Sequence, residues 1–87
     1  MTGECFLFHK FAPLERHHIF GGSNRKNSEK YGLVVDLCHD CHNEPPQGVH
    51  HNKAMMEVLH EYGQTKAMRE QHWTKEDFMR VFHANYI

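Results

Sequence analysis

Histidine and cysteine are the residues of this chain whose number and spacing point to chemistry. The 87 residues include ten histidines and three cysteines. Cys38 and Cys41 have the Cys-x-x-Cys spacing of half a tetrahedral zinc site or of a redox pair. The redox alternative needs a thioredoxin-like βαβ unit, for which the chain is too short. We therefore expect structural zinc, with a pair of reduced, partly buried thiols as the alternative.

A tetrahedral zinc site requires two more ligands. Cys5 is the third ligand that we expect. His9, in a Cys-x-x-x-His arrangement with Cys5, or His39 could supply the fourth. A bound metal would help to stabilise a chain this short, because its hydrophobic core is small.

Five other histidines have positions that suit a second metal site. His17 and His18 are adjacent, so one can bind a metal at a strand end while the other stays free as a base. His42 directly follows the cysteine pair, and His50 and His51 precede a predicted helix. His17, His42 and His50 could form an imidazole-rich site with positions open to water and phosphate. The alternative for the adjacent pair is two surface histidines.

The first half of the chain has the character of strands and turns. Apolar runs predict strands over Glu4–Phe8, Arg16–Phe20 and Leu33–Leu37, with a break at Pro13. The segment 21–32 begins with Gly-Gly-Ser-Asn, and we expect a loop there.

The second half has the periodicity of helices. A helix is expected from about His51, with Gly63 as a place where it ends or weakens. Its predicted buried face is Met55, Val58, Leu59 and Tyr62. Thr74, with an acidic residue three positions later, predicts the start of another helix. The sequence thus predicts a small α+β fold, forming a single domain over residues 1–87.

Charge is distributed unevenly. The formal net charge of -1 excludes a uniformly basic nucleic-acid binder. Residues 16–30, however, have a local net charge of +3, and they include Arg25 and Lys26. This stretch could contact a phosphate backbone, although a solvated loop would have the same composition. The sequence contains no run of eighteen apolar residues, so it predicts no membrane-spanning helix. The first ten residues do not have the pattern of a secretory signal.

Three segments taken together resemble a known family. They are Arg16-His17-His18-Ile19-Phe20-Gly21-Gly22, Leu33-Val34-Val35-Asp36-Leu37-Cys38-x-x-Cys41-His42-Asn43 and Gly48-Val49-His50. The combination is similar to HNH endonucleases, and more narrowly to small phage-borne HNH proteins, including the nuclease module of phage recombination-enhancement proteins. The resemblance covers roughly residues 4–62. It implies a ββα-metal (His-Me finger) core with a cysteine zinc knuckle, followed by a helical extension over about 63–87.

The resemblance also implies roles for single residues. His18 would be the general base, and His17, His42 and His50 would be ligands of a divalent metal. His51 is the second choice for the position of His50. Mg²⁺ is the metal that we expect, with Mn²⁺, Ni²⁺ or Zn²⁺ as alternatives.

The structural zinc would be held by four side chains in the family's pattern. Here these would be Cys5, Cys38 and Cys41, with His9 completing the set, because Phe8 occupies the position of the family's remaining cysteine.

A second departure concerns the middle asparagine of the motif. Leu33 occupies its position. Asn24, Asn27 or Asn43 could hold the loop in its place, although none is in register.

The function that we expect is that of a metal-dependent DNA endonuclease of phage or prophage type, which nicks DNA with weak sequence preference. Arg25 and Lys26 would contact DNA phosphates. The expected location is the bacterial cytoplasm, away from membranes, and a homodimer or a recombination partner is possible. The alternative function is a zinc-stabilised nucleic-acid-binding or adaptor module whose catalytic site has decayed. A metal-buffering histidine-rich protein is a weaker third reading.

Overall fold

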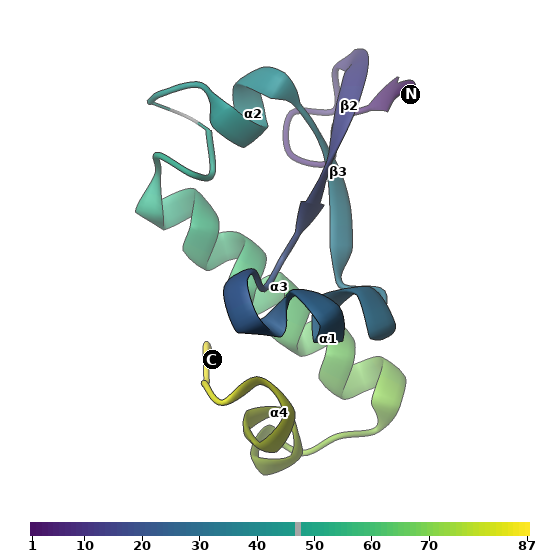
Figure 1. Cartoon of the computed structure of the whole chain (residues 1–87), viewed down its shortest axis with the longest axis vertical. Coiled ribbons are helices and arrows are strands. Elements are labelled where there is room, and N and C mark those ends of the chain that lie inside the picture. Colours follow the sequence, from purple (N-terminus) through teal and green to yellow (C-terminus); the bar gives the residue numbers. More distant parts are fainter. Residues whose placement is uncertain (47) are drawn as a thin grey trace.

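Three antiparallel strands and a long helix determine the arrangement of the chain (Figure 1). The computed structural model describes residues 1–46 and 48–87. The sheet has the order β1-β2-β3, with strands β1 (Thr2–Glu4), β2 (Phe11–His18) and β3 (Val34–Cys38). Five helical segments follow or interrupt the strands: the 3-10 turn η1 (Gly22–Asn24), α1 (Arg25–Lys30), α2 (His39–Asn43), α3 (Lys53–Gln71) and α4 (Lys75–Phe82). The α+β fold and the two C-terminal helices predicted from the sequence are confirmed.

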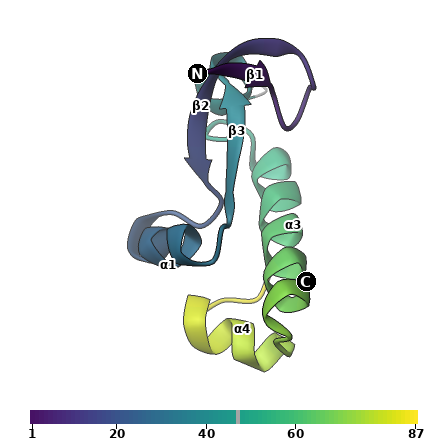
Figure 2. The ribbon, with the colours of Figure 1, turned by 90° about the vertical axis from the view of Figure 1, so that its right-hand side faces the viewer.

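Helix α3 runs along β2 and β3, and α4 turns back beneath α1 (Figure 2). Buried apolar side chains from these elements form the core, among them Phe20, Leu37, Leu59, Phe78 and Phe82. Among the described helices, none combines the length and the apolar character that a bilayer crossing requires.

The first predicted strand is wrong for most of its length. Only Glu4 of the segment Glu4–Phe8 belongs to a strand, and the chain turns directly after it. The His9 amide donates to the carbonyl of Cys5 at 2.8 Å, and His9 has a left-handed φ of 61°. This turn places Cys5 inside the protein, where it is fully buried.

The second strand begins earlier than predicted and includes Pro13. Its pairing with β3 extends only from Leu14, opposite Cys38, to His18, opposite Val34. Pro13 pairs with β1 alone, so its missing N–H costs no bond to β3. The strand ends at His18, and Ile19 and Phe20, predicted to be strand residues, are buried beyond its end.

The segment 21–32, predicted to be a loop, contains η1 and α1. Helix α1 is six residues long and buries only Ser28. Its sequence therefore has no apolar periodicity from which a helix could be predicted. The third strand, in contrast, is confirmed within one residue at each end.

Helix α3 passes through Gly63 without ending. A Cβ atom at this position would lie 2.7 Å from Ile19 Cγ2 and 2.9 Å from Phe20 Cε2. Glycine thus allows the helix to approach the residues that follow β2. The predicted apolar face is partly wrong, because Val58 and Tyr62 are exposed. The residues that α3 buries are Leu59, Gly63, Gln64 and Ala67.

The predicted start of α4 is confirmed. The Thr74 hydroxyl accepts from the Asp77 amide at 3.1 Å, and the Asp77 carboxylate accepts from the Thr74 amide at 3.0 Å. This reciprocal pair is a capping box.

Candidate functional site

Three imidazoles converge beside the end of β2. His17 comes from β2, His42 from α2 and His50 from the turn before α3. One nitrogen of each ring lies within 4.8 Å of a nitrogen of the other two, and the ring centroids are 4.7 to 5.2 Å apart. These residues, the histidine cluster, have the spacing of side chains that could hold one metal ion.

His17 is the buried member of the histidine cluster, with 4% of its surface exposed. Its Nε2 has no hydrogen-bond partner among the described residues. Burial, followed by the proximity of His42 and His50, lowers the pKa of His17 to about 4. The ring is therefore neutral at pH 7. A buried polar nitrogen without a partner is costly, and a metal ion would satisfy it.

His42 is held by a carboxylate. Its Nδ1 lies 2.9 Å from Glu15 Oε1, and Asn43 Nδ2 donates to the same oxygen at 3.0 Å. Hydrogen bonds from His39 and then from His42 lower the pKa of Glu15. With Nδ1 occupied, Nε2 is the nitrogen of His42 left for a metal. A carboxylate on the far nitrogen is the usual support of a metal-binding histidine.

His18 faces different partners. Its Nε2 donates to Glu29 Oε2 at 2.6 Å, and Arg16 donates to Oε1 of the same carboxylate. These two hydrogen bonds, first that of His18, lower the pKa of Glu29. Because a carboxylate only accepts, the hydrogen of the neutral His18 ring is on Nε2. Nδ1 is then the nitrogen that can take a proton.

One cavity connects these side chains. It has a volume of about 460 Å³. Its lining includes the whole histidine cluster, His18, Arg16, Arg25, Met56 and His60. A second cavity is lined by Arg16, His18, Arg25, Lys26 and Glu29, so that Arg16, His18 and Arg25 belong to both. The predicted phosphate contacts, Arg25 and Lys26, are therefore beside His18. His51, the second choice for a metal ligand, is exposed and belongs neither to the cluster nor to the lining of the first cavity.

Sequence reasoning missed Ser28, which fixes the chain just after the histidine pair. Its Oγ accepts from the Phe20 amide at 3.0 Å and donates to the Phe20 carbonyl at 2.7 Å. These two hydrogen bonds hold the segment after the histidine pair, a task for which the sequence suggested Asn24, Asn27 or Asn43. Asn24 and Asn27 instead donate to carbonyls at the end of α4, and Asn43 donates to Glu15. No motif spacing marks Ser28.

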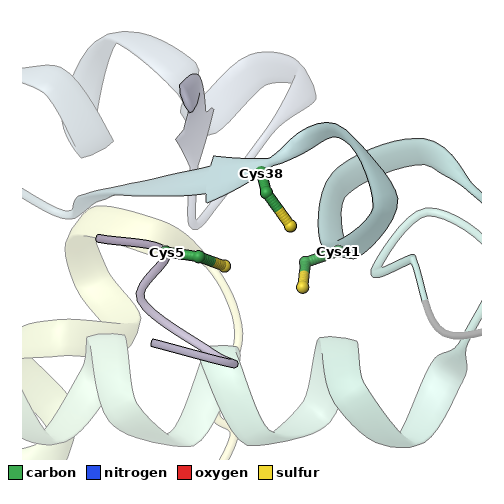
Figure 3. Close-up of side chains that lie close together, drawn as sticks. All are labelled: Cys5, Cys38 and Cys41. Carbon is green, nitrogen blue, oxygen red and sulfur yellow. The ribbon is translucent and has the colours of Figure 1, made fainter. Parts of the chain in front are cut away.

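The three cysteines form a second cluster, the cysteine cluster (Cys5, Cys38 and Cys41). Each is at most 2% exposed, and their sulfur atoms lie within 4.8 Å of one another. The sulfurs point into a common space between the N-terminal turn, the end of β3 and the start of α2 (Figure 3). The cluster could bind a metal ion and is compatible with structural zinc.

The pKa values of two of these thiols differ, and the lower one favours metal binding. Burial by itself would raise the pKa of Cys5. Hydrogen bonds to the backbone of Phe8, Cys38 and Leu7 outweigh it and lower the pKa to about 7. Burial raises the pKa of Cys41, and hydrogen bonds with Cys38 and Cys5 raise it further. Cys5 thus becomes the thiolate that metals bind more readily than Cys41 does.

The fourth predicted zinc ligand lies elsewhere. His9 is exposed, and its Nδ1 lies 3.0 Å from Glu4 Oε1. His39, the other residue considered, contacts Glu15 and Glu44. Within residues 1–46 and 48–87, no fourth histidine, cysteine or acidic side chain joins the cysteine cluster.

Comparisons with models of protein families, with curated proteins and with solved structures found no match to this chain. Its function therefore has to be inferred from the chemistry of its site.

Proposed function

We propose that this protein is a metal-dependent DNA endonuclease of the HNH type, which nicks DNA by hydrolysing a phosphodiester bond. One observation carries the proposal. A buried imidazole nitrogen of His17, without a partner among residues 1–46 and 48–87, belongs to a three-histidine cluster, and His18 lines the same cavity. The site thus offers metal ligands and a separate base within one cleft.

The histidine cluster would hold a divalent ion through His17, His42 and His50. Such an ion would stabilise the negative charge that develops on the phosphate and on the leaving oxygen. Imidazole ligands suit Zn²⁺ and Ni²⁺, whereas Mg²⁺ prefers oxygen ligands. The donor set therefore favours a transition metal over the Mg²⁺ that the resemblance suggests.

His18 would act as the general base. Its Nδ1 would take a proton from a water molecule, and the water oxygen would then attack the phosphorus while the bond to the leaving 3′ oxygen breaks. Arg25 and Lys26 would bind flanking phosphates, and such contacts give affinity without reading the sequence. A single basic cleft of this size suits cleavage of one strand.

The cysteine cluster would have a structural role. It joins the N-terminal turn to the β3–α2 junction, and α2 carries His42. Zinc bound there would fix one side of the histidine cluster without taking part in the reaction. Phage or prophage origin, a bacterial cytoplasmic location and pairing with a second copy or a recombination partner are parts of the same proposal.

Incubation of purified protein with supercoiled plasmid tests the proposal, with Mg²⁺, Mn²⁺, Ni²⁺ or Zn²⁺ added singly and with a chelator as the control. Conversion to the open circular form with at least one metal, abolished by the chelator, is the expected result. Plasmid that stays intact with every metal but is retarded in a gel would favour the alternative, a nucleic-acid-binding module.

A further inference from the structure

Helix α1 carries an acidic side chain, Glu29, in a cleft whose basic side chains would suit DNA. Glu29 lines the second cavity together with Arg16, Arg25 and Lys26. A carboxylate at this place repels phosphate and neutralises part of the basic surface. Its presence therefore calls for a task other than binding DNA.

The backbone of α1 is well fixed, although the helix is short. Ser28, the neighbour of Glu29, is fully buried and makes two hydrogen bonds with the backbone of Phe20. Asn24 and Asn27 attach the same segment to α4 through the carbonyls of Phe82 and Val81. Glu29 thus extends from a backbone that is held on two sides.

Both oxygens of Glu29 are engaged. Oε2 accepts from His18 Nε2 at 2.6 Å, and Oε1 accepts from Arg16. The carboxylate is about half exposed, at 52%, whereas the His18 side chain is 14% exposed. Ion pairs at such an exposed position add little to stability, which argues against a purely structural role.

We propose that Glu29 is a positioning residue that orients His18 for catalysis; this inference rests on the proposed nuclease function. By accepting from Nε2–H, Glu29 keeps the lone pair of the ring on Nδ1. When Nδ1 takes a proton from water, the ring becomes an imidazolium, and the adjacent carboxylate stabilises that charge. Arg16 holds the second carboxylate oxygen and so fixes the direction of the first.

The test compares Glu29→Gln, Glu29→Asp and wild type in plasmid nicking, with kcat and KM measured separately. Glu29→Gln is expected to lower kcat by about 10- to 100-fold. KM should stay constant or fall, because a negative charge has left the cleft. Glu29→Asp, which keeps the carboxylate, should retain more activity than Glu29→Gln. Glu4→Gln is the matched control, since Glu4 also contacts a histidine, His9, in an exposed pair outside the cleft.

Wild-type kcat in a folded Glu29→Gln protein would overturn the inference and leave the proposed function standing. An inactive wild type would instead overturn the proposed function. The orientation of His18 can then be tested without DNA, by ¹H–¹⁵N NMR of the Nε2–H group of its ring. An Nε2–H hydrogen that exchanges with solvent slowly in wild type and faster in Glu29→Ala would support the orienting role, and equal exchange rates would overturn it.

Discussion

His17 and His18 are neighbours in the chain, yet their surroundings give them different chemistry. His17 is buried among imidazoles and has an Nε2 without a partner among the described residues. His18 has its Nε2 bound to Glu29 and so keeps Nδ1 for a proton. Both line the same cavity, and these different partners would let the pair divide two tasks at one strand end.

This division predicts different effects of two alanine substitutions on metal binding. His17→Ala is expected to weaken binding at the histidine cluster by at least about 100-fold, because even loss of an outer partner of a ligand costs about 10- to 100-fold. His18→Ala should leave that affinity nearly unchanged. Calorimetric titration with Mn²⁺ or Ni²⁺ would measure both, with the exposed residue His72 replaced by alanine as the control. A loss of affinity in His18→Ala alone would mean that the two roles are exchanged.

Some side chains of the site could be predicted from the sequence, and others could not. The members of the histidine and cysteine clusters stand in motifs whose spacing is visible in the chain. Ser28 and Glu29 have no such signal, because their roles depend on α1 folding against the end of β2. His9 was predicted from its distance to Cys5 in sequence, but the turn directs it toward Glu4 instead.

At the scale of elements, the approach of α3 to the end of β2 determines the position of the cleft. Met56 and His60 of α3 line the cavity together with the histidine pair. The approach depends on Gly63, where a Cβ would come within 3.0 Å of Ile19 and Phe20 atoms. A residue that would weaken an isolated helix is thus required by the packing of this one.

Gly63→Ala is therefore expected to lower the free energy of unfolding by about 1–3 kcal/mol through overpacking. Urea denaturation would measure the change. Gly21→Ala is the control, because no atom lies within 4 Å of the Cβ position at Gly21. At a helix position without close neighbours the same substitution would stabilise by up to about 1 kcal/mol, so a stabilised Gly63→Ala would contradict the packing.

Elements with a local signal were predicted well, and those that depend on packing were not. The apolar run of β3 and the capping box of α4 are contained in a few consecutive residues. The extent of β2 depends on pairing with two different strands, and the continuity of α3 depends on contacts of Gly63. Helix α1 is held by polar contacts rather than by an apolar face, so no hydrophobic pattern marks it.

At the scale of the molecule, the cysteine cluster could compensate for a small core by binding a metal ion. Three thiols converge, and Phe8 occupies the fourth place of the expected knuckle with 53% of its surface exposed. Substitution of an exposed phenylalanine removes little buried surface, so the position can be changed at small cost. The turn backbone around Phe8 already hydrogen-bonds to Cys5.

Phe8→Cys is expected to complete a four-thiolate site and to raise zinc affinity by at least about tenfold. The thermal midpoint should rise when zinc is present and should not rise when a chelator is added. Thermal denaturation under both conditions would measure this, with Phe8→Ser as the control for loss of the ring. Equal midpoints of the two variants in zinc would show that position 8 does not face the metal.

The charge of the whole molecule limits how much DNA it can contact. Its net charge is -1, and the basic side chains at the cleft left for phosphate are Arg25 and Lys26, since Arg16 is bound to Glu29. About two phosphate contacts predict a slope of roughly -2 in log K against log salt concentration. Fluorescence anisotropy with a labelled duplex over a range of salt would give the slope. A much steeper value would mean that DNA extends over surfaces beyond this cleft.

The central claim, that His18 is the base of a metal-dependent nuclease, is tested most directly by plasmid nicking with wild type and His18→Ala side by side. The variant must first be shown to have the wild-type circular dichroism spectrum and metal stoichiometry. Nicking by wild type that falls at least about 100-fold in the folded, metal-loaded variant is the predicted result. Equal nicking by the two proteins would contradict the claim and assign the activity to another base or to a contaminant.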